Sequence, residues 1–367
     1  MLWPDYSNCG TNLAASIARF FGVSPMHTTL PKVDRLLMSG SYRNVVLLVM
    51  DGLGMEVLQR CLPENGLLRS HLLQPLSAVF PSTTTAATTS LISGLNPGEH
   101  GWIGWSLHFE QLSKSVDTFS NLIQFTSEPV ADYHAASTLL PYRPLVQQVS
   151  DTRNAQGLYI SPYGDIKVNS LNGLVEQIIK ALGVPGRHYV YAYWGEPDHT
   201  MHQIGCRHTK IRGVAENIEQ ALLAINQSLT TEDLVLVTAD HGLIDAVPDC
   251  FEDHPHLERM LRFPPAVEPR AAALYVHQEA SADFSSAFRE AFEDRYLLMK
   301  GDQAIASGLF GPGQAHPLLR SLVGDYFAVA TSDHALFQKR EHCKLIGMHA
   351  GLTEQEMLVP LIALTKA

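Results

Sequence analysis

Apolar residues occur along this chain in short continuous runs that alternate with amphipathic segments. Residues 44–50, 188–194 and 233–239 are almost continuously apolar, and polar residues do not alternate with the apolar ones. This pattern is typical of strands buried on both faces. Segments 55–62, 171–182 and 211–229 repeat their apolar residues at helical spacing. Strands that alternate with helices in this way predict an α/β fold with a mostly parallel central sheet and helices on both faces.

The pattern changes after residue 262. An apolar stretch at 270–277, a helical segment at 285–297 and a Gly/Pro-rich segment at 306–317 follow one another before core-like apolar sequence returns at 357–364. We therefore predict an α/β core formed by residues 1–262 and 339–367. Residues 263–338 are predicted to form a smaller inserted α+β cap that covers the ligand site.

Composition excludes several classes of protein. The formal net charge of −11 over 367 residues argues against sequence-independent nucleic-acid binding, which needs clustered Lys and Arg. The five cysteines are scattered without a C-x-x-C motif, which favours free thiols in a reducing compartment. Neither a signal peptide nor an apolar stretch of roughly 20 residues is recognisable. We expect a cytoplasmic protein that does not bind membranes; its oligomeric state is not predicted.

Carboxylates and imidazoles follow the predicted strands. One strand ends in an Asp, the second is followed by an Asp and a His four residues apart, and the third ends in an Asp-His pair. The carboxyl ends of parallel strands meet at one edge of a sheet, where ligands gather. Carboxylate and imidazole together are the ligands expected for zinc or a similar divalent ion. With a histidine near the C-terminus, the predicted ligands are Asp51, Asp198, His202, Asp240, His241 and His349.

Other acidic and histidine residues resemble these ligands without meeting the same criteria. Asp333 and His334 also follow a strand-like run, but they lack a following glycine and lie in the predicted cap. His254 and His256 are expected in a solvated loop beside the site. We therefore leave these four residues out of the predicted metal site.

Residues 79–94, VFPSTTTAATTSLISG, contain eight hydroxyl side chains in sixteen positions. Threonine is β-branched and a mediocre helix former, so this stretch is poor material for an ordinary surface helix. A Thr-rich linker is the simplest alternative, but it does not explain the closing Gly94 and the NPGEHG sequence that follows. A hydroxyl with a chemical role is the hypothesis that we pursue.

Five motifs in order resemble the alkaline phosphatase superfamily, and within it the type I phosphodiesterase/nucleotide pyrophosphatase family. They span residues 44–362 and read VVLLVMDG, FPSTTTAATTSLISGLNPGEHGWIGW, YWGEPDHTMHQIG, VLVTADHG and GMHAGLTEQEMLVPL. The resemblance implies two adjacent divalent metal ions, zinc or else manganese, on either side of the reacting phosphoryl group. It assigns Asp51, Asp240 and His241 to one ion and Asp198, His202 and His349 to the other.

The resemblance also implies a threonine nucleophile ten residues before the glycine that closes the motif, which is Thr84. Coordination to a divalent ion lowers the pKa of a hydroxyl, so Thr84 is predicted both as a metal ligand and as the catalytic residue. A helix that begins there would also favour a phosphoryl anion, with Ser82 or Thr83 as its N-cap. Choosing Thr84 over Thr83 or Thr85 depends on the family register alone.

The implied activity is hydrolysis of a phosphodiester or pyrophosphate bond in a nucleotide-like small molecule, through a phosphothreonine intermediate. In the family that the sequence resembles, members that hydrolyse nucleotides have an asparagine three residues after the nucleophile that donates to phosphate. This chain has Ala87 there, so the donor must come from elsewhere. That difference keeps a phosphomonoesterase and a phosphonate hydrolase open. A phosphomonoesterase would need extra positive charge, for which Arg207 and Lys210 are the candidates in the sequence.

A catalytically silent metal-binding module is the alternative from a different class. A metal-dependent phosphoglycerate mutase is disfavoured because it typically has a serine nucleophile and a larger insertion. A sulfatase is disfavoured because the C/S-x-P-x-R pattern is missing. The residues that bind the rest of the substrate are not predicted.

Overall fold

The three continuous apolar runs form the middle of a seven-stranded sheet in the computed structural model, which describes residues 1–366. β1 (Asn44–Met50) lies between β8 (His188–Trp194) and β9 (Asp233–Thr238), and all three strands run parallel. Every residue of β1 is buried, as a strand covered on both faces requires. The carboxyl ends of three strands that are far apart in sequence therefore meet at one edge.

The outer strands complete a mixed sheet. Its order is β2 (Leu72–Ser77), β18 (Leu358–Thr365), β9, β1, β8, β6 (Gln156–Ser161) and β7 (Ile166–Lys167). β18 runs antiparallel to both of its neighbours, whereas β6, β8, β1 and β9 are parallel. The predicted α/β fold with a mostly parallel central sheet is confirmed, with β18 as the exception.

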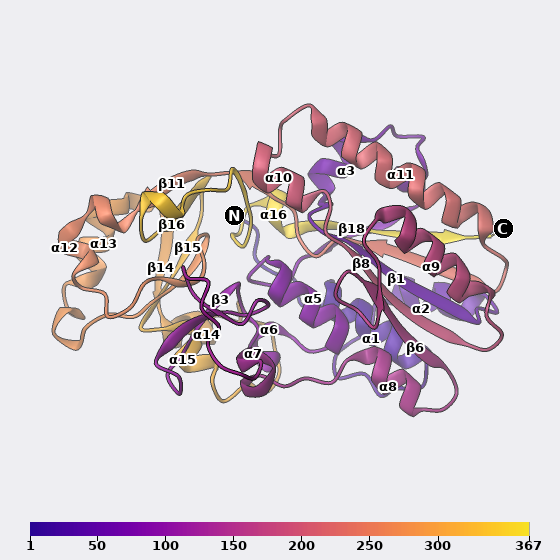
Figure 1. Cartoon of the computed structure of the whole chain (residues 1–367), viewed down its shortest axis with the longest axis horizontal. Helices are drawn as coiled ribbons and strands as arrows, with labels where there is room; N and C mark the ends of the chain where they lie inside the picture. The colour runs from indigo at the N-terminus through magenta and orange to yellow at the C-terminus, as the bar shows by residue number, and fades with distance from the viewer. Residues whose placement is uncertain (367) are drawn as a thin grey trace.

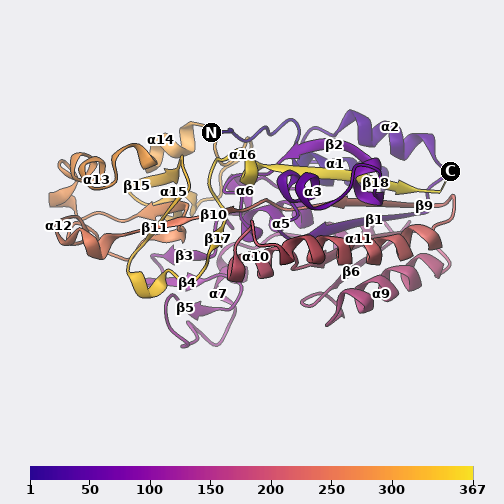
Figure 2. The same cartoon turned by 90° about the horizontal axis from the view of Figure 1, so that it is seen from above.

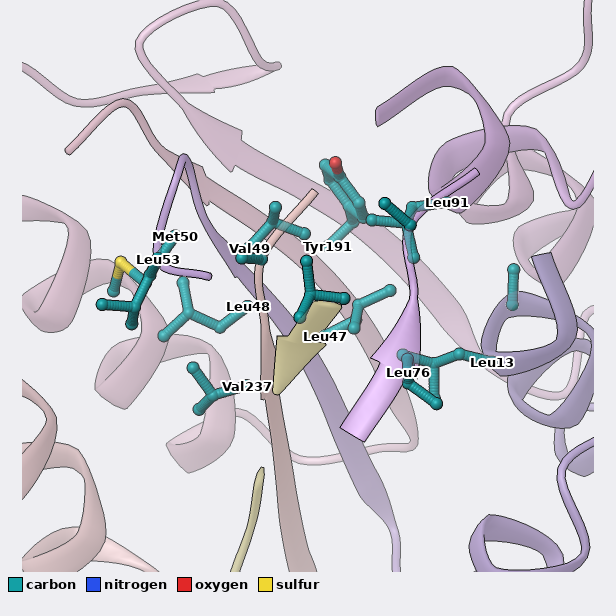
Figure 3. Packing of buried hydrophobic residues seen from close by; sticks show 14 of the residues in the cluster. Leu13, Leu47, Leu48, Val49, Met50, Leu53, Leu76, Leu91, Tyr191 and Val237 are labelled. Atoms are coloured by element: carbon teal, nitrogen blue, oxygen red, sulfur yellow. The ribbon is translucent and has the colours of Figure 1, made fainter. Parts of the chain in front are cut away.

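Helices cover both faces of this sheet, as predicted. α9 (Leu171–Gly183) and α11 (Lys210–Ser228) lie on one face, and α1 (Gly10–Phe20) and α5 (Thr84–Ser93) lie on the other (Figures 1 and 2). Figure 3 shows Leu47 and Val49 of β1 on the side of Tyr191 and Leu91, and Leu48 on the side of Val237. Alternate residues of one strand thus fill two apolar layers.

The other helical segments are shorter. In the described part of the chain none of the helices has both the length and the apolar composition to cross a membrane. These segments are α2 (Pro31–Ser39), α3 (Met55–Cys61), α4 (Leu67–Ser70), α6 (Pro97–His100), α7 (Ala135–Leu139), α8 (Leu145–Asp151), α10 (Asp198–Ile204), α12 (Pro255–Glu258), α13 (Phe284–Phe292), α14 (Gly301–Ala306), α15 (Leu319–Val323), α16 (Glu354–Met357) and the 3₁₀ turns Phe251–Asp253, Gln278–Ala280, Glu293–Arg295 and Arg340–His342.

A second sheet forms a separate lobe, on the left in Figure 1. Its order is β14 (Tyr296–Lys300), β15 (Tyr326–Ala330), β13 (Ala271–Leu274), β12 (Ala266–Glu268), β3 (Ser106–Phe109), β4 (Lys114–Asp117) and β5 (Leu122–Ile123). The first four strands lie within residues 263–338, and β3–β5 come from earlier in the chain. The predicted boundaries of the cap stay a prediction. Two short ladders complete the strands: β10 (Ile244–Asp245) pairs with β17 (Gly347–Met348), and β11 (Val247–Cys250) pairs with β16 (His334–Phe337) in the second lobe (Figure 1).

A buried ion pair joins the second lobe to the core. Arg270, between β12 and β13, donates two hydrogen bonds to Glu356 of α16 at 2.6 and 2.8 Å, and both side chains are fully buried. Glu356 also accepts from the backbone N–H of Gly351 at 2.8 Å. Burial alone would raise the pKa of Glu356, but the charge and hydrogen bonds of Arg270 outweigh it and lower the pKa.

Replacing Glu356 with glutamine is expected to lower the free energy of unfolding by about 3–5 kcal/mol, because it leaves the Arg270 guanidinium buried and unpaired. A lowered folded-state pKa means that the stabilisation is complete above the pKa of an unfolded glutamate and is lost as the pH falls through the folded value. Urea unfolding from pH 7 to pH 3 measures both effects. Asp302→Asn, at the exposed pair with Arg320, is the control and should cost under about 1 kcal/mol.

Candidate active site

The first cluster of polar residues lies at the carboxyl ends of β1 and β9. Asp51 follows β1, and Asp240 and His241 follow β9; all three side chains are buried, with ligand atoms within 4.8 Å of one another. Gly52, with φ +72°, lets the end of β1 approach Asp198 of the neighbouring segment, because a Cβ at position 52 would lie 2.9 Å from the Cβ of Asp198. Its N–H donates to Asp240 Oδ1 at 3.2 Å, which ties the two strand ends together.

The second cluster consists of Asp198, His202 and His349. Asp198 begins α10, and His202 lies one turn later, with its Nε2 3.2 Å from Asp198 Oδ2. His349 follows β17, and its Nε2 lies 3.9 Å from Asp198 Oδ1. The ring nitrogen Nδ1 of His202 lies 2.6 Å from the carbonyl oxygen of Gly347. That hydrogen bond leaves Nε2 as the free ligand atom.

The two clusters touch. The rings of His241 and His349 stack with centroids 3.9 Å apart, so the six residues form one site with two centres. Burial, together with the charges of Asp198 and Asp240, raises the pKa of Asp51 well above its usual value. Burial, together with His241 and His202, lowers the pKa of His349. Carboxylates that repel one another beside imidazoles are a set suited to bound cations.

The donor atoms fit a pair of divalent ions. Within residues 1–366, Asp51 Oδ1, Asp198 Oδ1 and Asp240 Oδ2 are buried without a hydrogen-bond partner. A buried carboxylate oxygen without a partner is costly, and each cluster contains at least one. Aspartate and histidine are also the ligand types that zinc and manganese share. The structure therefore brings together all six predicted ligands in the two groups that the resemblance implied.

Thr84 lies beside the first cluster. Its Oγ1 is 3.1 Å from His241 Nε2 and 3.4 Å from Asp51 Oδ2. α5 begins at Thr84, with Thr83 in the N-cap position. The Thr83 hydroxyl does not cap the helix but donates to Glu268 at 2.6 Å, and Thr85 Oγ1 is buried. Of the three consecutive threonines, Thr84 is therefore the one whose hydroxyl meets the clusters.

Tyr193 is a site residue that the sequence analysis missed. Its hydroxyl donates to Asp51 Oδ2, and burial and the charge of Asp51 raise the pKa of Tyr193 well above its usual value. It orients the Asp51 carboxylate from the neighbouring strand β8. The only signal in the sequence is a tyrosine one residue before the end of a buried strand.

The two clusters and Thr84 open into a cavity of about 960 Å³ between the core and the second lobe. Aromatic side chains form part of its walls, and within the described residues neither Lys nor Arg lines it. Arg207 and Lys210 are exposed and lie outside the lining, so they do not supply the positive charge that a phosphomonoesterase would need. The aromatic side chains of the lining are Trp105, Phe119, Phe125, Tyr142, Tyr159, Tyr163, Tyr191, Tyr193, Trp194 and Phe337.

Ala87 stands where the resemblance implies an asparagine that donates to phosphate. Ala87 is buried against Cys9, Val79 and Ala86 and does not line the cavity. Its side chain lies in the packing between α5 and the N-terminal segment. Position 87 is a packing position in this fold.

The residues left out of the predicted metal site lie apart from the two clusters. His334 Nδ1 is 3.0 Å from Asp249 Oδ2, and the side chain of Asp333 is 65% exposed. The ring of His254 packs edge-on against Phe292, and His256 is exposed. None of these four residues joins a three-residue metal-type cluster in the described part of the chain.

The family model for type I phosphodiesterase/nucleotide pyrophosphatase matches residues 45–303, which is well over half of the chain and includes five of the six clustered residues and Thr84. The chain belongs to this family. No curated protein sequence matches the chain significantly.

Solved structures share the fold of this phosphodiesterase-family chain. Murine ectonucleotide pyrophosphatase/phosphodiesterase 5 is 18% identical, with a TM-score of 0.66 and 88% of each chain covered. An inactive threonine-to-alanine variant of the same protein in complex with AMP is 17% identical, with a TM-score of 0.64. The match covers 86% of this chain and 87% of that one. Phosphonoacetate hydrolase from Sinorhizobium meliloti in complex with phosphonoacetate is 14% identical, with a TM-score of 0.65. The match covers 89% of this chain and 90% of that one. At these identities the likeness shows the fold.

Proposed function

We propose that this protein is a metal-dependent hydrolase that cleaves phosphodiester or pyrophosphate bonds in nucleotide-like small molecules through a phosphothreonine. The observation that carries the proposal is the position of Thr84, whose hydroxyl meets His241 and Asp51 at the start of α5. Two divalent ions, zinc or manganese, held by the two clusters would supply positive charge that lowers the pKa of the Thr84 hydroxyl and neutralises the phosphoryl oxygens.

The chain's own groups account for the remaining steps. Thr84 Oγ1 attacks phosphorus, an O–P bond forms to the threonine, and the bond to the leaving alcohol or phosphate breaks. The Thr84 hydroxyl donates to Asp51 Oδ2, which Tyr193 holds in place. The first turn of α5 has no side-chain cap, so its N–H groups and positive end face the phosphoryl oxygens. Water then attacks the phosphothreonine in line and releases Thr84, which gives net retention at phosphorus.

One structural relative supports this assignment. A threonine-to-alanine change gives an inactive form of murine ectonucleotide pyrophosphatase/phosphodiesterase 5, and that form binds AMP. Both facts agree with a threonine nucleophile and a nucleotide-like ligand. Phosphonate hydrolysis is the second candidate, because phosphonoacetate hydrolase shares the fold over most of both chains.

A catalytically silent metal-binding module is disfavoured because the clusters and Thr84 are assembled together. A cytoplasmic location stays a prediction from the sequence.

The charge of the cavity favours a diester over a monoester. A phosphodiester carries one negative charge, whereas a phosphomonoester carries nearly two at neutral pH. The cavity offers no lysine or arginine in the described chain for the second charge. With zinc added, kcat/KM for bis-p-nitrophenyl phosphate is therefore expected to exceed that for p-nitrophenyl phosphate by at least about tenfold.

Both substrates release p-nitrophenolate, so absorbance measures both reactions directly. Phosphonoacetate, followed by phosphate release, completes the comparison. Faster turnover of p-nitrophenyl phosphate would make the protein a phosphatase, and faster turnover of phosphonoacetate would make it a phosphonate hydrolase. Failure on all three substrates with two metals bound would contradict the proposed activity.

A further inference from the structure

Glu268 is a buried carboxylate in the wall of the active-site cavity. It ends β12, is 8% exposed and lines the cavity together with Thr84 and the second cluster. Both of its hydrogen bonds go to one oxygen: Oε1 accepts from the Thr83 hydroxyl at 2.6 Å and from the backbone N–H of Trp105 at 2.8 Å. Oε2 is therefore left for whatever occupies the cavity.

The position of this carboxylate is energetically costly. Its two partners are a hydroxyl and an amide instead of a cation, and Arg270, two residues later, is held by Glu356. Burial raises the pKa of Glu268 to about 7. A buried carboxylate without a cationic partner is destabilising, and the hydrogen bonds offset this cost only in part.

The backbone before Glu268 is strained as well. Val267 has φ +76°, a left-handed conformation that a β-branched residue rarely adopts. Gly104 packs directly against it, and a Cβ at position 104 would lie 2.6 Å from Val267 Cγ1. Strained residues of this kind persist where the surrounding structure fixes them, and they gather at functional sites. The buried charge of Glu268 and the strained backbone of Val267 both cost free energy, and the sheet requires neither. Together they point to a function for the Glu268 carboxylate.

Glu268 is tied to the start of the nucleophile's helix. Its partner Thr83 is the N-cap of α5 and immediately precedes Thr84. Because the Thr83 hydroxyl is turned to Glu268, it does not cap the helix, and the first N–H groups of α5 stay available to a phosphoryl group. A phosphoryl group bound at those N–H groups would therefore lie close to the Glu268 carboxylate.

We propose that Glu268 is a specificity-determining residue that selects singly charged phosphodiesters over doubly charged phosphomonoesters. The inference rests on the proposed function and adds to it the residue that sets the substrate class. In a diester the two non-bridging oxygens share one negative charge. A monoester carries a second negative charge, which the Glu268 carboxylate repels. Like charges a few ångströms apart in a buried site interact strongly because little water screens them.

Glu268→Gln tests the proposal because the amide oxygen of glutamine can still accept both hydrogen bonds while the charge is lost. The substrates are methyl p-nitrophenyl phosphate and p-nitrophenyl phosphate, which share a leaving group and differ by one negative charge. At about pH 8.5 the monoester is a dianion, and the ratio of its kcat/KM to that of the diester is expected to rise about tenfold in the variant.

Glu290→Gln is the matched control, since Glu290 is an exposed carboxylate on α13 of the same lobe. Its ratio should equal that of the wild type. Glu268→Ala is the second variant if Glu268→Gln does not fold, and its ratio should move in the same direction. Circular dichroism establishes that each variant is folded.

The outcomes separate this inference from the proposed function. An unchanged ratio, or an equal loss on both substrates, would show that Glu268 only positions Thr83 and would overturn the inference while the hydrolase assignment stands. A wild-type protein that binds two metals and hydrolyses neither ester would overturn both. A rise in the ratio for both Glu268 variants and not for Glu290→Gln supports the inference.

Discussion

Thr84→Ala is expected to lower kcat/KM for bis-p-nitrophenyl phosphate by about 10⁴-fold or more, with little change in the melting temperature. The hydroxyl is the group that forms the covalent bond to phosphorus, and no neighbouring hydroxyl can replace it. Thr83 is turned to Glu268 and Thr85 is buried. Thr84 is half-buried at the cavity wall, so removing its hydroxyl and methyl group leaves the packing of α5 intact.

The matched control is Thr85→Val, which removes a hydroxyl one residue away and keeps the shape of the side chain. It should retain activity within about threefold, because Thr85 Oγ1 has no partner within residues 1–366 and does not reach the cavity. Thr84→Ser should retain measurable turnover and accumulate a phosphoserine that mass spectrometry detects after rapid acid quenching. Full activity in Thr84→Ala, or loss of activity in Thr85→Val, would move the nucleophile to another residue.

Much of the core could be predicted from sequence because its signals are local. Continuous apolar runs gave β1 and β8 at their full length and β9 to within one residue, and the helices 171–182 and 211–229 match α9 and α11 to within one residue. The polar residue at each strand end then followed from the parallel sheet, since carboxyl ends share an edge. The strand ends alone therefore predict that Asp51, Asp198 and Asp240 lie close together.

The pairing of strands in the second lobe could not be predicted from local sequence patterns. β3 and β12 pair through Ser106 and Val267, which lie far apart in sequence, and both strands are too short to show a period. Glu268 lies within this pairing, so its place beside Thr83 depends on a contact between distant segments. Nothing in residues 263–270 marks it except one acidic residue in a largely apolar stretch.

Removing divalent metal is the second change with a very large expected effect. Dialysis against a chelator should reduce hydrolysis by about 10³-fold or more, and added zinc or manganese should restore it. The melting temperature should fall at the same time, since Asp51, Asp198 and Asp240 would be left buried close together without neutralising charge. Elemental analysis of the protein as purified is expected to give two metal ions per chain, one for each cluster.

Single substitutions distinguish the two centres. His241→Ala and His349→Ala should each reduce the metal content to about one ion per chain and abolish turnover, because each removes one of only three ligands in its cluster. His254→Ala and Asp333→Asn are the controls, and both should keep two ions and full activity because these residues lie outside the clusters. Loss of metal in a control, or full metal content in His241→Ala, would mean that the ions lie elsewhere. If all four variants behave as expected, the strand-end carboxylates and histidines are a two-metal site, and the orphaned oxygens of Asp51, Asp198 and Asp240 are its ligand atoms.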